Sequence, residues 1–166
     1  GPETRARGTR ASAPSTINLP PVLAKRFAIE SRFKEGNQAA LLLCSTIGHP
    51  DERVVVKMFH NVAPADGTDP RKGYRALSSD HIVHYVDPYF GTFEDRWWEV
   101  MEYCAFGTAR DLADREGGRL GQDELRALIE QMTDALDHIH TSTQHIVHRD
   151  VKPGNILVRS EEPLDF

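Results

Sequence analysis

The chain has 166 residues, of which 39% are hydrophobic and 27% charged, and its formal net charge is −5. These values predict about one globular domain with a sizeable core and exclude a collagen-like or disulfide-stapled scaffold. The mild negative charge argues against general nucleic-acid or membrane binding, and no stretch approaches the roughly 18 apolar residues of a membrane helix. Cys44 and Cys104 are too few for a disulfide framework or a zinc site, so we expect free thiols in a reducing compartment, the cytoplasm.

The first half of the chain reads as a tail followed by strands. Residues 1–21 mix arginine, serine and proline without an apolar period and are expected to form a flexible tail. Residues 27–33 and 40–46 predict two strands joined by a turn at 34–37. The β-branched run 53–59 predicts a third, central strand.

The pattern then changes from strands to helices. After a loop, Asp69 and a following proline predict the start of a short helix that ends near residue 77. Residues 82–88 and 96–103 predict two more strands, and apolar residues at three- and four-residue steps predict an amphipathic helix over 122–140. Together these elements predict an α+β fold. A five-stranded antiparallel sheet with one short helix comes first, and the remaining helices follow it in the chain.

One motif past the long helix carries the functional interpretation. Residues 148–155 read His-Arg-Asp-Val-Lys-Pro-Gly-Asn, and a short apolar run follows them. This segment resembles the catalytic loop of the protein kinase family, H-R-D-L-K-x-x-N. Phosphoryl transfer needs a carboxylate to orient the attacking hydroxyl and accept its proton, positive charge near the phosphoryl group, and an oxygen ligand for Mg²⁺. Asp150, Lys152 and Asn155 are expected to supply these in turn, and the lysine favours the serine/threonine branch of the family.

The same resemblance implies a nucleotide site in the first hundred residues. Lys57 ends the run Val-Val-Val-Lys on the predicted third strand, which places it as the ligand of the α- and β-phosphates. Met101 is implied as the gatekeeper, and the backbones of Glu102 and Cys104 as the groups that bond the adenine edge. The side chains implied to sandwich the adenine ring are Leu41, Val55 and Leu157.

The sequence departs from the family pattern in three places. Of the three glycines of the phosphate-binding loop only Gly36 is present, and its backbone is expected to lie against the phosphates. Between Glu52 and Glu94 there is no glutamate to pair with Lys57. We expect Asp69 to cap the short helix and Lys57 to use the nucleotide as its counter-charge, with a pairing to Asp66 or Asp69 left open. The third departure is at Asp165-Phe166, which come too soon after the catalytic loop to be the family's D-F-G motif, so we expect that motif beyond them.

The resemblance therefore implies part of a protein kinase domain over residues 22–166. Its N-lobe is expected at about 22–102, its hinge at about 102–107 and the start of its C-lobe at 108–166. The implied activity is transfer of the γ-phosphoryl group of ATP, with Mg²⁺, to a serine or threonine hydroxyl of a protein substrate. We expect the 166-residue chain by itself to be inactive. The alternative is a pseudokinase that keeps the fold and acts by binding, which the missing glutamate and the eroded glycine loop would favour.

Overall fold

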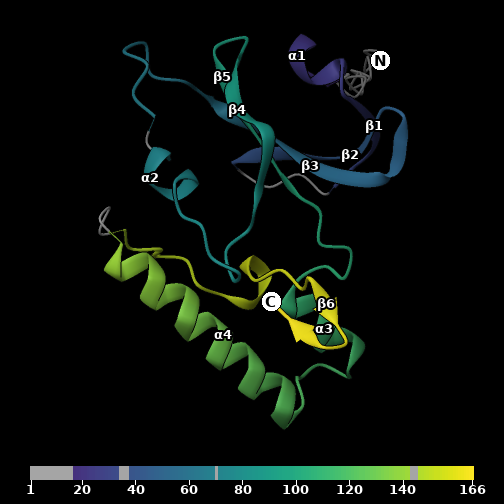
Figure 1. The fold of residues 1–166 in the computed structure, drawn as a ribbon, viewed down its shortest axis with the longest axis vertical. Helices are drawn as coiled ribbons and strands as arrows, with labels where there is room; N and C mark the ends of the chain where they lie inside the picture. The colour runs from purple at the N-terminus through teal and green to yellow at the C-terminus, as the bar shows by residue number, and fades with distance from the viewer. Residues whose placement is uncertain (1–16, 34–37, 70, 143–145) are drawn as a thin grey trace, which may run out of the picture.

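The computed structural model describes residues 17–33, 38–69, 71–142 and 146–166. A twisted sheet forms one half of the molecule and two helices with a small hairpin form the other, as Figure 1 shows. The chain end at Phe166 lies in the helical half, beside the short helix that follows the sheet.

The sheet half contains five antiparallel strands in the order β1-β2-β3-β5-β4. Their bounds are β1 Phe27–Arg32, β2 Ala39–Thr46, β3 His49–Val62, β4 Tyr85–Phe93 and β5 Arg96–Glu102. This confirms the five-stranded antiparallel sheet. Two strands differ from prediction, because β3 pairs with β2 from His49 onward and β4 starts three residues late and runs on through Gly91 to Phe93.

One face of the sheet packs on the first apolar core. Side chains alternate between the faces of a strand, so Leu42, Val56 and Trp98 point to the same side and are almost completely buried. Helix α1 (Pro21–Ala24) covers this face with Leu23, and the partly buried residues Ile17 and Leu19 pack beside it. Residues 17–20 of the expected tail therefore lie against the sheet, and residues 1–16 are outside the described chain.

The short helix after β3 is smaller than expected. Helix α2 covers only Lys72–Arg75, and Asp69 Oδ1 accepts a hydrogen bond of 2.9 Å from the backbone N–H of Arg71, at the entry to the helix. The predicted cap is therefore wrong: the N-cap of α2 is Arg71, which makes no side-chain cap bond, Asp69 lies two residues before it, and the helix stops after one turn. Glycine in the middle of such a short helix disfavours it, and α2 contains Gly73.

The helical half consists of α3 (Ala109–Arg115), α4 (Gln122–Thr141), the 3₁₀ turn η1 (Pro153–Asn155) and the hairpin β6 (Ser160–Glu161)–β7 (Leu164–Asp165). The long helix is confirmed. The short apolar run 156–158 forms only an isolated bridge between Leu157 and Thr108. Two hydrogen bonds make this bridge and join the run to the entry of α3: Ala109 N–H donates to Ile156 O, and Val158 N–H donates to Gly107 O, both at 2.8 Å.

A second apolar core holds the helical half together. It buries Leu112 of α3 with Ile156, Val158 and Phe166. The catalytic-loop segment is thereby fixed to α3 on one side and to the hairpin on the other. None of the helices in the described part of the chain is long and apolar enough to cross a membrane.

Candidate functional site

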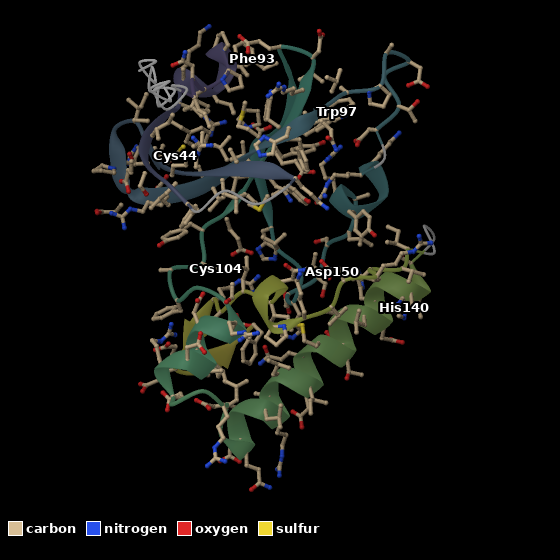
Figure 2. All side chains as sticks on the ribbon, turned by 180° about the vertical axis from the view of Figure 1, so that it is seen from behind. Cys44, Phe93, Trp97, Cys104, His140 and Asp150 are labelled. Carbon is tan, nitrogen blue, oxygen red and sulfur yellow. The ribbon has the colours of Figure 1, made fainter. Side chains whose placement is uncertain are left out.

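The catalytic-loop residues form a compact polar group at the boundary between the two halves, where Figure 2 shows Asp150. Asn155 Nδ2 donates hydrogen bonds to Asp150 Oδ2 at 2.9 Å and to the Asp150 backbone carbonyl at 3.0 Å. Lys152 Nζ lies 3.6 Å from the same Asp150 Oδ2. The predicted catalytic residues are therefore brought together around one carboxylate.

The backbone of the loop sets this arrangement. Arg149 adopts a left-handed conformation with φ 67°, which turns the chain sharply just before Asp150. Asp150 N–H then donates to His148 Nδ1 at 3.2 Å, and Asn155 N–H closes the 3₁₀ turn on Lys152 O at 2.9 Å. Asp150 remains 65% exposed at its side chain, so a substrate hydroxyl can approach it from solvent.

The expected nucleotide contacts of the sheet share one face. In the β2–β3 register Leu41 lies opposite Lys57, and in the β3–β5 register Val55 lies opposite Met101. Side chains of directly opposed residues project on the same side of a sheet, so these four residues point away from the first core. This is the face toward the helical half, which lies below the sheet in Figure 1.

A cavity of about 260 Å³ lies between the two halves. Five of the expected nucleotide or metal residues line it: Met101, Glu102, Cys104, Asn155 and Leu157. Leu41, Val55 and Lys57 lie on the adjoining sheet face rather than in its lining. Gly36 is outside the described residues.

The hinge is fixed by an ion pair that the sequence did not indicate. Arg159 donates to both oxygens of Glu102, from Nη2 at 2.9 Å and from Nε at 3.1 Å, and also bonds Asp165 and the carbonyl of Asp80. Burial alone would raise the pKa of Glu102, but the bonds from Arg159 and from the His84 N–H outweigh it, so the pKa lies below its ordinary value. The Glu102 side chain is thus held by the helical half, while its backbone stays at the end of β5.

Cys104 is in the hinge, between the sheet and α3 in Figure 2. Burial raises the pKa of its thiol to about 11, and burial raises that of Cys44 to about 11 as well. Both are free and buried cysteines, as predicted. Neither is suited to act as a nucleophile, since the thiolate is the reactive form.

Lys57 is largely removed from water. Burial lowers the pKa of its ammonium, the nearby Arg71 guanidinium lowers it further, and the Glu99 carboxylate opposes both. Lys57 Nζ also lies 4.8 Å from the centre of the Phe59 ring, within the range of a cation–π contact.

The two aspartates left open as partners of Lys57 are engaged elsewhere. Asp66 Oδ1 accepts from the Thr68 N–H at 2.9 Å, and Asp69 Oδ2 pairs with Arg75. The carboxylate whose charge reaches Lys57 is Glu99 on β5, outside the stretch from 52 to 94 in which a partner was sought. A glutamate in the otherwise apolar run Trp-Trp-Glu-Val-Met was the available signal.

Metal-ligating groups are sparse around this loop. In the described ranges no three His, Cys, Asp or Glu side chains converge on a common metal position. The amide nitrogen of Asn155 makes both of its bonds to Asp150, so the amide oxygen is the atom that suits a hard cation. The donor set therefore fits Mg²⁺ only if phosphate or water oxygens complete the shell.

Comparison with known proteins agrees with this geometry. The family model described as protein kinase domain matches residues 43–164. Serine/threonine-protein kinase 4 homolog B of Dictyostelium discoideum is 34% identical over 87 residues, which are 52% of this chain and 8% of that protein. The crystal structure of Rad53 1–466 in complex with AMP-PNP matches with a TM-score of 0.69 and 25% identity, over 85% of this chain and 37% of that one.

These two halves, joined at a hinge with a His-Arg-Asp loop between them, define a kinase-like fold. The chain belongs to the protein kinase domain family. It spans about a third of the solved relative and less than a tenth of the curated one.

Proposed function

We propose that this chain forms the nucleotide-binding and catalytic-loop part of a protein serine/threonine kinase that transfers the γ-phosphoryl group of ATP to a protein hydroxyl. The observation that carries the proposal is the group of Asp150, Lys152 and Asn155 around one carboxylate at the edge of the cavity between the halves. The similarity to a serine/threonine kinase supports the choice of substrate hydroxyl. Placement in the cytoplasm rests on the free thiols alone and stays part of the proposal.

Each residue has a defined task in the reaction. The exposed Asp150 carboxylate orients the substrate hydroxyl and accepts its proton as the new P–O bond forms and the bond from the γ-phosphorus to the bridging oxygen breaks, with ADP as the leaving group. Lys152, next to it, stabilises the negative charge on the transferred group. Asn155 holds Asp150 through its amide nitrogen and offers its amide oxygen to Mg²⁺, which neutralises phosphate charge when bound.

The nucleotide is expected to lie against the sheet face of Leu41, Val55 and Met101, with its phosphates toward Lys57. Val55 stands where the family has a small alanine, so the adenine pocket is narrower at that point. The backbones of Glu102 and Cys104, two residues that line the cavity, are expected to bond the adenine edge.

The test is phosphoryl transfer by the full natural protein that contains these residues, measured with radiolabelled ATP, Mg²⁺ and a mixed-sequence serine/threonine peptide library. Label on peptide hydroxyls that disappears in an Asp150→Asn variant would support the proposal. Nucleotide binding without any transfer by the wild-type protein would refute it and leave a binding module.

A further inference from the structure

The least expected side chain in the molecule is Glu99, in the middle of β5. Its side chain is completely buried, although glutamate is almost never fully buried without a partner. Glu99 lies directly opposite Lys57 in the β3–β5 register, so the two side chains project from the same face of the sheet. This face lies under the α2 segment, which consists of helix α2 and its N-cap residue Arg71.

Two arginines of the α2 segment hold this carboxylate. Arg71 Nε lies 2.8 Å and Arg75 Nη1 2.5 Å from the same oxygen, Glu99 Oε1. Arg75 is itself nearly buried: it pairs with Asp69 on one side, and its guanidinium lies 3.7 Å from the centre of the Phe90 ring on the other. The second carboxylate oxygen, Glu99 Oε2, has no hydrogen-bond partner within the described residues.

We propose that Glu99 on β5 is the positioning residue for Lys57 and supplies its counter-charge through the open Oε2 oxygen, while Arg71 and Arg75 fasten the α2 segment to the other oxygen. The inference rests on the proposed function, because it assigns the support of the proposed phosphate ligand. It places the acid on the sheet and the bases on the α2 segment.

The charged side chains around Lys57 and Glu99 form a cluster whose net charge favours a bound nucleotide. It contains three cations and two carboxylates: Lys57, Arg71, Arg75, Asp69 and Glu99. One positive charge is left over in a largely buried place, which favours an anion beside Lys57. Phosphate oxygens of a bound nucleotide meet that need, so Glu99 would orient Lys57 and the phosphates would neutralise it.

A counter-charge carried by β5 has a mechanical consequence. The backbones of Lys57 and Glu99 are held opposite each other by the pairing of neighbouring strands. The orientation of Lys57 would then persist if the one-turn helix α2 shifted, because α2 contributes arginines and no carboxylate to the lysine. The α2 segment would affect Lys57 only through the repulsion of Arg71.

The experiment measures the protonation of Lys57 without requiring catalysis. In the full natural protein, Lys57 would be labelled with 5′-(fluorosulfonyl)benzoyl adenosine, whose fluoride the neutral amine displaces, and the labelled peptide identified by mass spectrometry. The labelling rate is followed from pH 6 to 11. The charged groups that face Lys57 are Arg71 of the α2 segment and Glu99 of β5, with Tyr85 of β4 beside them.

Glu99→Gln keeps the shape of the side chain and removes the charge that raises the Lys57 pKa. The profile of labelling rate against pH should therefore move to lower pH by about one unit. The KM for ATP should rise several-fold more than kcat falls, and Glu99→Asp should restore part of both. The matched control is Glu30→Gln, which breaks the exposed pair with Arg53 on the same sheet and should leave the profile unchanged. An unchanged Glu99→Gln profile would overturn the proposal and leave Glu99 as a clamp for α2.

A second variant covers the case in which Glu99→Gln does not fold, since it leaves the buried Arg75 and the partly exposed Arg71 facing a neutral amide. Arg75→Gln with Glu99→Gln keeps the cluster charge constant, and its profile is compared with that of Arg75→Gln alone. A further shift to lower pH supports the proposal, and identical profiles refute it. A shift of the labelling profile in a protein that transfers no phosphate would refute the proposed function but support this inference.

Discussion

Replacement of Arg159 by glutamine tests how firmly the hinge is tied to the helical half. Arg159 makes two hydrogen bonds to Glu102 and one to Asp165 at 3.2 Å, and its side chain is only 26% exposed. The variant removes the cation and leaves both carboxylates without this partner. Glutamine is shorter than arginine, so its amide does not reach the Asp80 carbonyl that Arg159 Nη1 bonds.

The expected cost follows from burial. Hydrogen bonds to charged groups contribute about 1.5–3 kcal/mol each when well buried, and exposed ion pairs contribute about 0–1 kcal/mol. Glu102 is 20% exposed, so we expect Arg159→Gln to lower the free energy of unfolding by an intermediate amount, about 2 kcal/mol, and the Tm by roughly 4–8 °C. The matched control is Arg115→Gln, whose pair with Glu161 is about twice as exposed and should contribute at most about 0.5 kcal/mol to the free energy of unfolding.

The stability contributed by the pair of Glu102 and Arg159 should depend on pH in a direction that the Glu102 pKa fixes. The pKa of Glu102 in the folded protein lies below the ordinary 4.5, so its ion pair contributes stability that is present above pH 4.5 and is lost as the pH falls through the folded value. Thermal unfolding of wild type and Arg159→Gln should therefore differ fully at pH 7 and converge in acid. Equal Tm values at pH 7, or a gap that does not shrink below pH 4.5, would refute this account of the hinge.

Three further outcomes are expected. Asp150→Asn should lower the single-turnover transfer rate by about 10²–10⁴-fold with ATP affinity within twofold, and a wild-type rate would remove Asp150 from its role. Gly91→Ala should cost about 1–3 kcal/mol in urea unfolding, because a Cβ there would lie 2.3 Å from the Trp98 ring; Gly154→Ala, which meets nothing within 4 Å, is the control. The thiols of Cys44 and Cys104 have pKa values of about 11, so only about 0.1% of each should be thiolate at pH 8. A colorimetric thiol reagent should therefore label them far more slowly in the folded protein than in urea. Comparable rates in the two conditions would contradict the burial.

The sequence predicted the sheet and the catalytic loop because both are encoded locally. Strands 27–33 and 40–46 show a β-branched or apolar run between turn residues, and the loop around Asp150 is a continuous motif. The five strands of the sheet and the grouping of Asn155 with Asp150 follow from these local signals, whereas the order of the strands does not. The boundaries moved where backbone pairing continued past the side-chain pattern, as in β3.

The ion pairs around the site could not be predicted in the same way. Arg71 and Arg75 meet Glu99 from 28 and 24 residues away, and Arg159 meets Glu102 from 57. A single glutamate in an apolar strand is ordinarily interpreted as a solvent-facing residue, because burying it without partners is costly. Only the packing of the α2 segment over the sheet makes burial of Glu99 possible.

The two halves of the molecule have separate apolar cores, and the cavity between them is lined mainly by apolar side chains, with charged groups at Arg71, Glu102 and Arg159. The first core lies behind the sheet and the second under α3, while the boundary contains Glu102 with Arg159 and, beside it, Glu99 with its arginines. Ionic contacts are directional and can be exchanged for contacts to a charged ligand, whereas an apolar seam would have to be opened. A boundary of this kind can admit an anionic nucleotide without disturbing either core, because the cluster around Lys57 and Glu99 carries one surplus positive charge that favours the phosphates.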